Sequence, residues 1–127
     1  PLVDVSRYGI LTGVWEDKKD RVLNVSVMTE KPKASYAEEH LGVLDSDNEK
    51  KYFSVFGQYI LTPEVFEQLA SDIATADSEN STREIELTSA LEAVRQRSGM
   101  IGVRLDGKMY DMGNPVAFRN AVMEYSK

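Results

Sequence analysis

Apolar and polar positions alternate along two short stretches near the start of the chain, 8–15 and 22–28. In the second stretch Leu23, Val25 and Val27 are separated by polar residues, a period of two that is typical of a strand buried on one face. The charged segment EDKKDR connects the two stretches. The pattern therefore predicts two strands joined by a charged connection.

A polar segment, 33–51, comes next, followed by a strongly apolar run, FSVFGQYIL, at 53–61. We expect the polar segment to form a mobile surface loop that can include a helical turn, because it is rich in charged and turn-forming residues. The apolar run predicts a further strand.

Helices are expected in the second half of the chain. The first begins at TPEVF, since Thr62 can cap free amide groups and Pro63 suits the first helical position. A polar linker is expected at 75–83, and a second helix within 88–97. Asn114-Pro115 repeats the combination of cap and proline, and predicts a last helix. The apolar face expected for the first helix consists of Val65, Phe66, Leu69 and Ile73.

A hairpin is expected between the second helix and the last one. Ile101, Val103 and Leu105 alternate as in a strand, Asp106-Gly107 is a strong two-residue turn, and 108–112 would return. Helices interleaved with strands predict an α/β or α+β layered domain.

Length and composition are ordinary for a soluble globular protein. The 127 residues fit one domain, because domains commonly run to roughly 100–200 residues, and 42% of them are hydrophobic. No apolar stretch approaches the roughly 18 residues that cross a bilayer, so no membrane partner is expected. The chain begins without methionine and in the middle of a strand-like pattern, which favours a piece of a longer protein.

Charge and cysteine content narrow the function classes. The formal net charge of −6 argues against nucleic acid as a partner, because phosphate backbones need a basic stripe. A small phosphorylated ligand needs only one or two cations and stays possible. The chain has no cysteine, which excludes disulfides, thiolate metal sites and cysteine nucleophiles. This composition is compatible with a reducing cytosol, and we expect a cytoplasmic protein.

Several short stretches carry a resemblance to a known family. They are DVSRYGI at 4–10, EKPK at 30–33, GQYILTPEVF at 57–66, REIELTSAL at 83–91 and GKMYDMGNPVAF at 107–118. Together they resemble the C-terminal half of sugar-1-phosphate nucleotidyltransferases, and most of all the bacterial UTP–glucose-1-phosphate uridylyltransferases.

The resemblance implies the α/β class and, within it, the C-terminal portion of a doubly wound, Rossmann-like nucleotidyltransferase fold. A mixed sheet with flanking helices is expected. Residues 1–127 would be a single domain, the sugar-binding part of the enzyme. The family's glycine-rich triphosphate loop has no counterpart here, so the N-terminal nucleotide-binding half is expected to be absent and the chain alone to be inactive.

The activity that the resemblance implies is transfer of a uridylyl group. UTP and glucose 1-phosphate would form UDP-glucose and pyrophosphate, with Mg²⁺ as cofactor. Such chemistry needs positioning and charge neutralisation more than covalent catalysis.

The resemblance also assigns residues to the sugar site. Glu30 resembles the glutamate that accepts hydrogen bonds from glucose hydroxyls, and Lys31 resembles the catalytic cation that neutralises the sugar phosphate. Tyr8 and Gly9 would let the backbone approach the sugar, and Val55 would pack against it. The alternatives are a solvated turn at the two charges, a bulge glycine and an ordinary core valine.

Asp111 resembles a catalytic aspartate that binds Mg²⁺ in this family. Magnesium takes one or two carboxylates together with water and substrate phosphates, so a single aspartate would be half of a site. The alternative is an aspartate that caps a turn. Glu84 and Thr88 are expected to order a helix start rather than touch substrate, and His40 is expected to be solvated.

Three residues depart from the family pattern: Ser89, Gln58 and Pro115 stand where aspartate, arginine and lysine are usual. They leave the nucleotide open, so dTTP or GTP is an alternative to UTP. A non-catalytic module for oligomer contacts or regulation is the alternative from another class. Unpaired strand edges invite association, so a homo-oligomer is expected.

Overall fold

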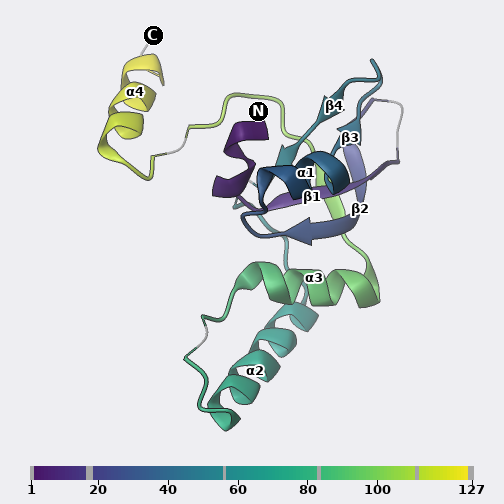
Figure 1. Ribbon diagram of the computed structural model, residues 1–127, viewed down its shortest axis with the longest axis vertical. Coiled ribbons are helices and arrows are strands. Elements are labelled where there is room, and N and C mark those ends of the chain that lie inside the picture. The colour runs from purple at the N-terminus through teal and green to yellow at the C-terminus, as the bar shows by residue number, and fades with distance from the viewer. Residues whose placement is uncertain (1, 17–18, 56, 83, 111, 126–127) are drawn as a thin grey trace.

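The computed structural model describes residues 2–16, 19–55, 57–82, 84–110 and 112–125. Their elements follow one another from a short 3₁₀ helix at the N-terminus to an α-helix near the C-terminus (Figure 1). They are η1 (Leu2–Arg7), β1 (Ile10–Trp15), β2 (Val22–Thr29), α1 (Ala34–His40), β3 (Val43–Leu44), β4 (Lys50–Lys51), β5 (Phe53–Ser54), α2 (Pro63–Ser78), α3 (Leu87–Ser98), β6 (Ile101–Val103) and α4 (Pro115–Tyr125).

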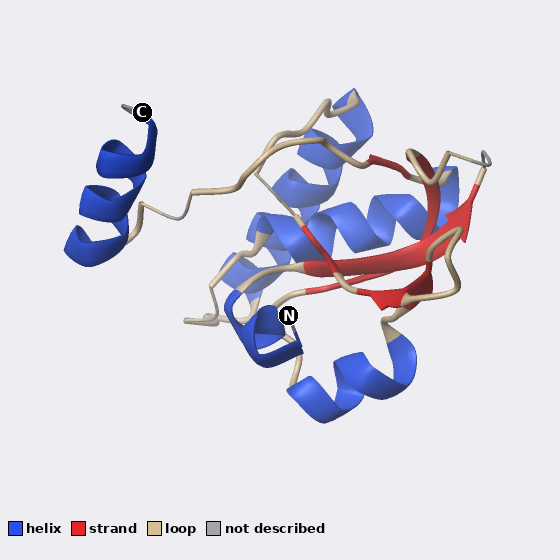
Figure 2. Cartoon of the chain, turned by 90° about the horizontal axis from the view of Figure 1, so that it is seen from above, coloured by secondary structure: helices blue, strands red, loops and turns tan. Residues whose placement is uncertain are grey.

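The larger sheet has the strand order β5-β1-β2-β6, and β3 and β4 form a small second sheet. Every pairing between the described strands is antiparallel. Helices lie on both sides of the strands (Figure 2). The expected α/β class with flanking helices is thereby confirmed. The expected mixed sheet is wrong for the described strands, because no parallel pair occurs among them.

Two apolar layers fix the helices to the sheet. On one side, η1 and α1 pack through Val5 and Ala37 against Ile10 of β1. On the other side, α2 and α3 pack through Val65 and Leu91 onto β2, and they lie below the sheet in Figure 1. Burial of these side chains on both faces explains why β1 and β2 form the centre of the fold.

A bulge shapes the two central strands. Their register shifts between Thr12 and Gly13, so that Thr12 pairs with Val27 and Gly13 with Val25. Ser26 is the extra residue, and its hydroxyl donates to the Thr12 carbonyl at 3.2 Å. A Cβ at Gly13 would lie 2.0 Å from the backbone oxygen of Asn24, so only glycine permits this close approach.

The predicted strands at 8–15 and 22–28 are confirmed, with β1 beginning only at Ile10. The helix at Pro63 and the helix within 88–97 are confirmed as α2 and α3. The predicted last helix is confirmed as α4. Thr62 is indeed the residue that precedes α2, although its side chain makes no capping hydrogen bond.

Three local expectations are wrong. Among the described residues of the apolar run at 53–61, only Phe53–Ser54 form a strand, and Ile60 is fully exposed. No strand forms in the described part of 108–112, so the hairpin at Asp106-Gly107 is absent there. The linker expected at 75–83 is helical as far as Ser78.

The polar segment 33–51 is more ordered than expected. It contains α1, a helix of 7 residues, and the small β3–β4 sheet. Leu41 and Val43 are almost completely buried and hold the segment to the body of the fold. The few apolar residues in it therefore decide its structure, rather than the many charged ones.

Two helices expose apolar residues. In α2, Val65 is buried and Leu69 is half-buried, but Phe66 and Ile73, both expected on its apolar face, are exposed. The α4 helix stands apart from the sheet at the end of an extended segment (Figure 1). None of the helices that the structure describes is long and apolar enough to cross a membrane.

Candidate functional site

The turn after β2 brings together the residues expected to contact a sugar. Glu30 follows β2 directly, and one of its carboxylate oxygens, Oε2, lies 3.0 Å from the position of a Cβ at Gly9. The same Cβ would lie 3.5 Å from Cγ2 of Val55. Val55 is held there because its amide N–H donates to the Gly9 carbonyl at 2.8 Å. Gly9, Glu30 and Val55 thus surround one spot at the edge of the sheet.

Backbone contacts hold this turn against the start of β1. The amide N–H of Lys31 donates to the carbonyl of Tyr8 at 3.1 Å. Lys31 has a φ of 41°, in the left-handed region that non-glycine residues rarely adopt. Pro32 follows it and is buried. The unusual backbone angle is the local feature that directs the chain away from β2 and keeps Lys31 beside Glu30.

The Glu30 carboxylate has two different environments. Its Oε2 accepts a hydrogen bond from the Thr88 hydroxyl at 2.8 Å. Its Oε1 lies 3.8 Å from the Lys31 ammonium, whose side chain is 64% exposed, whereas that of Glu30 is 28% exposed. One oxygen is therefore engaged inside the fold, and the other faces the cation and solvent.

Thr88 differs from the expectation. It lies in the first turn of α3, but the residue that precedes this helix is Glu86, and no side-chain capping bond is formed there. The hydroxyl of Thr88 instead reaches Glu30, across 58 positions of sequence. The interpretation of Thr88 as a residue that orders the helix start is wrong, because its hydroxyl donates to Glu30 at the end of β2.

Tyr59 also lies close enough to feel the charge of Glu30. Burial raises the pKa of the Tyr59 phenol, and the negative charge of Glu30 raises it further. Tyr59 is 40% exposed.

The remaining predicted residues have different positions. The ring of Tyr8 packs against the cluster formed by Val5, Ile10 and their neighbours, with the Arg7 guanidinium 5.6 Å from its centre. Asp111, expected to bind Mg²⁺, lies outside the described residues. The side chain of His40 is 49% exposed beside Glu39, which agrees with the expected solvated position, and its ring lies at a tilt against that of Tyr36.

A long apolar groove of about 830 Å³ begins at this site. It runs along the sheet between the segment after β5 and the segment around β6. Its walls are mostly large apolar side chains, and several of them are exposed in the chain. The exposed ones include Tyr59, Ile60, Val103, Leu105 and Met109, whereas Val55 is half-buried. Val55 belongs both to the groove and to the surroundings of Gly9, and so connects the two.

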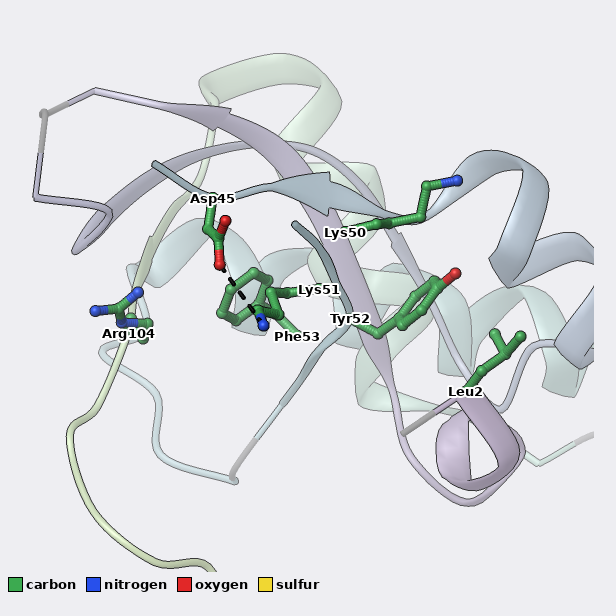
Figure 3. Close-up of a pocket in the computed structure, with 7 residues that line it drawn as sticks. All are labelled: Leu2, Asp45, Lys50, Lys51, Tyr52, Phe53 and Arg104. Carbon is green, nitrogen blue, oxygen red and sulfur yellow. Dashed lines mark ion pairs between the residues drawn. The ribbon is translucent and has the colours of Figure 1, made fainter. Parts of the chain in front are cut away.

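A second hollow, of about 500 Å³, lies beside β4 and β5 (Figure 3). Its cations are Lys50, Lys51 and Arg104. Lys51 is already paired with Asp45, at 3.7 Å, and with Glu49. The hydrogen bond to Glu49 raises the pKa of Lys51. Because Lys51 is neutralised by the chain's own carboxylates, the hollow offers a weaker anion site than its composition implies.

Carboxylates and histidine do not gather in groups of three or more among the described residues, so that part of the chain holds no complete metal site. Glu30 is also a poor candidate for a metal ligand, because its carboxylate is shared between Thr88 and Lys31.

The family is established by comparison with known proteins. A profile described as "Nucleotidyl transferase" matches residues 2–127, nearly the whole chain. The chain belongs to the nucleotidyl transferase family.

The relatives that it resembles carry a common name. A UTP–glucose-1-phosphate uridylyltransferase of Staphylococcus haemolyticus is 31% identical over 120 residues, which cover 94% of this chain. The matched part is only 35% of that relative's own length. The chain therefore spans about a third of the curated relative.

Solved structures support the same fold. An apo UDP-glucose pyrophosphorylase is 30% identical with a TM-score of 0.70, and the match covers 98% of this chain and 39% of that one. A UDP-glucose pyrophosphorylase complexed with UDP-glucose is 29% identical with a TM-score of 0.68, covering 99% and 41%. The expected nucleotidyltransferase fold is thereby confirmed.

Sequence patterns did not place Thr88 or Tyr59 beside Glu30. Both lie within stretches that carry the family resemblance, REIELTSAL and GQYILTPEVF. Their place in these two stretches is the one feature of the sequence that could have marked them as candidate site residues. Their proximity to Glu30 depends on how α3 and the segment after β5 pack, which local patterns do not reveal.

Proposed function

We propose that this chain is the sugar-binding part of a UTP–glucose-1-phosphate uridylyltransferase. The observation that carries the proposal is the turn at Glu30 and Lys31, where a carboxylate and an exposed cation lie side by side next to Gly9. The names of the relatives support the choice of substrates.

Each residue receives a role from its position. A carboxylate oxygen can accept more than one hydrogen bond, so Oε1 of Glu30 would receive those of the sugar hydroxyls. The Lys31 ammonium would neutralise the sugar phosphate. Gly9 would admit the sugar close to the backbone, Val55 would pack against it, and Tyr8 would hold the turn through its carbonyl.

The reaction then needs little covalent help from the protein. A phosphate oxygen of glucose 1-phosphate attacks the α-phosphorus of UTP, a new P–O bond forms, and the bond to the β-phosphate breaks to release pyrophosphate. Lys31 would lower the charge repulsion between the two phosphorylated substrates and orient the attacking oxygen.

Asp111 is proposed as one ligand of Mg²⁺, on the resemblance of GKMYDMGNPVAF alone. The ion would supply further charge neutralisation at the phosphates. Substrate phosphates, water and the rest of the protein would complete its coordination.

We also propose that the apolar groove is covered in the longer protein by the nucleotide-binding part. A patch as apolar as the one around Ile60, Val103 and Leu105 is unusual on a free surface.

In the 127-residue chain produced alone, the same patch and the unpaired edges of β5 and β6 are expected to cause self-association. A mass in sedimentation that stays monomeric at all concentrations would contradict this. We place the longer protein in the cytoplasm.

The proposal is tested by turnover of the full-length parent protein. With UTP, glucose 1-phosphate and Mg²⁺, we expect pyrophosphate release. Glu30→Ala should raise KM for glucose 1-phosphate by about a hundredfold, because hydrogen bonds to a charged group are each worth roughly 1.5–3 kcal/mol. Lys31→Ala should lower kcat/KM, and Asp111→Ala should abolish turnover. Lys33→Ala, which removes a nearby exposed cation, is the matched control and should have little effect.

The outcomes separate the alternatives. Release with dTTP or GTP but not UTP would keep the site and change the nucleotide. Normal turnover in Glu30→Ala and Asp111→Ala would overturn the assigned roles. No turnover with any nucleotide and sugar phosphate would favour the non-catalytic module.

A further inference from the structure

The hydroxyl of Thr88 donates its hydrogen bond to a residue outside its own helix. It lies in the first turn of α3, yet it donates its hydrogen bond to Oε2 of Glu30, at 2.8 Å, rather than to the backbone of the helix. The residue is half-buried, so the bond is partly screened from water. A hydroxyl that reaches a carboxylate across the fold restricts the rotation of that carboxylate.

We propose that Thr88 is a positioning residue that fixes the Glu30 carboxylate for the sugar. This inference rests on the proposed function of the site. Thr88 occupies Oε2 and thereby leaves Oε1 as the oxygen that is offered to hydroxyl groups of the ligand. Thr88 itself does not touch the sugar.

The space around Oε2 supports this division. A Cβ at Gly9 would lie only 3.0 Å from Oε2, so this oxygen is confined between Gly9 and Thr88. The Lys31 ammonium is on the side of Oε1, at 3.8 Å. A ligand phosphate bound by the Lys31 ammonium would therefore lie near Oε1 of Glu30. That oxygen could then accept hydrogen bonds from the hydroxyl groups of the same ligand.

The donor is held on a rigid support. α3 is attached to β2 through Glu92, which accepts the amide N–H of Met28 at 3.1 Å. Leu91 and Met28 are both buried in the cluster between the helix and the sheet. Glu30 follows the strand that α3 is fixed to, so donor and acceptor keep their distance without a ligand. A site held in this way loses less entropy when substrate binds.

The test compares Thr88→Val with Thr88→Ser in the full-length parent protein. Valine keeps the shape and removes the hydroxyl, whereas serine keeps the hydroxyl. We expect Thr88→Val to raise KM for glucose 1-phosphate about tenfold, with kcat and KM for UTP within about twofold, because one hydrogen bond to a charged group is lost. Thr88→Ser should recover most of the difference. Thr62→Val is the matched control, since it removes a threonine hydroxyl next to a helix start where no side-chain cap bond exists.

A double-mutant cycle with Glu30→Gln isolates the contact from any general loss of stability. If Thr88 acts through Glu30, Thr88→Val should change KM for the sugar phosphate far less in the Glu30→Gln background than in wild type. Equal effects in both backgrounds would overturn the inference. So would a Thr88→Val variant whose KM is unchanged while Glu30→Ala is impaired, and in that case the proposed function stands. An inactive wild-type parent, in contrast, overturns the proposed function and this role with it.

Discussion

Two regions of the molecule are rich in apolar side chains. One is the cluster between β2, α2 and α3, and the other is the groove beside β6. They differ in what covers them. At the first, Met28, Leu91 and Val65 are at most 5% exposed. In the groove, Ile60 is fully exposed and Val103 is 61% exposed. The first region is completed by contacts within the chain, and the second is not.

This difference shows which part of a ligand site the chain can build alone. The proposed sugar side, with Glu30 and Lys31, lies at the end of β2, in the region completed by contacts within the chain. There Thr88 donates to Glu30, and the amide of Lys31 donates to the Tyr8 carbonyl. The groove begins at Val55, on the other side of the same site. The nucleotide side would therefore be completed only when a second body covers the groove.

The largest expected effect tests the scaffold of the self-contained region. Gly13→Ala places a Cβ 2.0 Å from the Asn24 carbonyl oxygen, and a backbone atom cannot be moved aside by a rotamer change. We expect a loss of about 3 kcal/mol or more in the free energy of unfolding of the parent protein. Gly102→Ala is the matched control, because its nearest contact would be an ordinary 3.4 Å. Comparable urea midpoints for the two variants would show that the bulge is not as tight as described.

The next effect compares the two regions directly. Leu91→Ala should cost about 3 kcal/mol in unfolding free energy wherever it is measured, because a buried leucine leaves a cavity. Ile60→Ala should cost less than about 0.5 kcal/mol in the 127-residue chain alone, where Ile60 is exposed. In the parent protein we expect it to cost about 2 kcal/mol, as for a buried position. A negligible cost there as well would contradict a covered groove.

A smaller effect concerns the link between α3 and β2. The hydrogen bond from Arg95 lowers the pKa of the Glu92 carboxyl below its ordinary 4.5, with help from Gln96 and the Met28 amide. The ionised group therefore contributes stability above the unfolded-state pKa, and this contribution is lost as the pH falls through the folded-state pKa. Glu92→Gln should cost about 1 kcal/mol at neutral pH, and less as the pH falls below 4.5.

Urea unfolding at a series of pH values measures this dependence. Glu67→Gln, at an exposed position of α2, is the control and should show no cost at any pH. A cost for Glu92→Gln that is independent of pH would mean that the side chain acts through packing rather than charge.

The smallest effect is a titration beside Glu30. Because burial and the Glu30 charge raise the pKa of Tyr59, its phenol should ionise above the ordinary 10.0, and Glu30→Gln should lower the midpoint. Folding favours the neutral phenol, so this contribution to stability is lost as the pH rises through the folded-state pKa. The difference in phenolate absorbance between wild type and Tyr59→Phe gives the midpoint. An unchanged midpoint in Glu30→Gln would show that the charge of Glu30 does not act on the Tyr59 phenol. Glu38→Gln on α1 is the control and should leave the midpoint of Tyr59 unchanged.

The sequence predicted most of the elements but not their burial. The alternation around Leu23 and Val25 and the Thr62-Pro63 start were local signals, and they were sufficient for β2 and α2. The run at 53–61 is apolar because much of it lines the groove, and its pattern was therefore mistaken for a strand. An apolar pattern therefore does not by itself distinguish a strand from a segment that lines a groove.

The candidate site was predictable where the family resemblance named its residues. Gly9, Glu30 and Val55 lie close together, which local periodicity alone would not have indicated, and their roles toward a sugar stay predictions. The bond from Thr88 to Glu30 was not predictable, because it joins residues 58 positions apart and depends on the packing of α3. Asp111 lies outside the described residues and stays a prediction.

At Lys31, thermal stability and the proposed activity favour different residues. Its φ of 41° costs a non-glycine residue about 1 kcal/mol, so Lys31→Gly should make the protein more heat-resistant while deleting the proposed phosphate-binding cation. A selection for thermostable variants that ignores turnover would accept this replacement, and a selection for turnover would reject it. The persistence of lysine at so unfavourable an angle would then record which of the two pressures had acted on the chain.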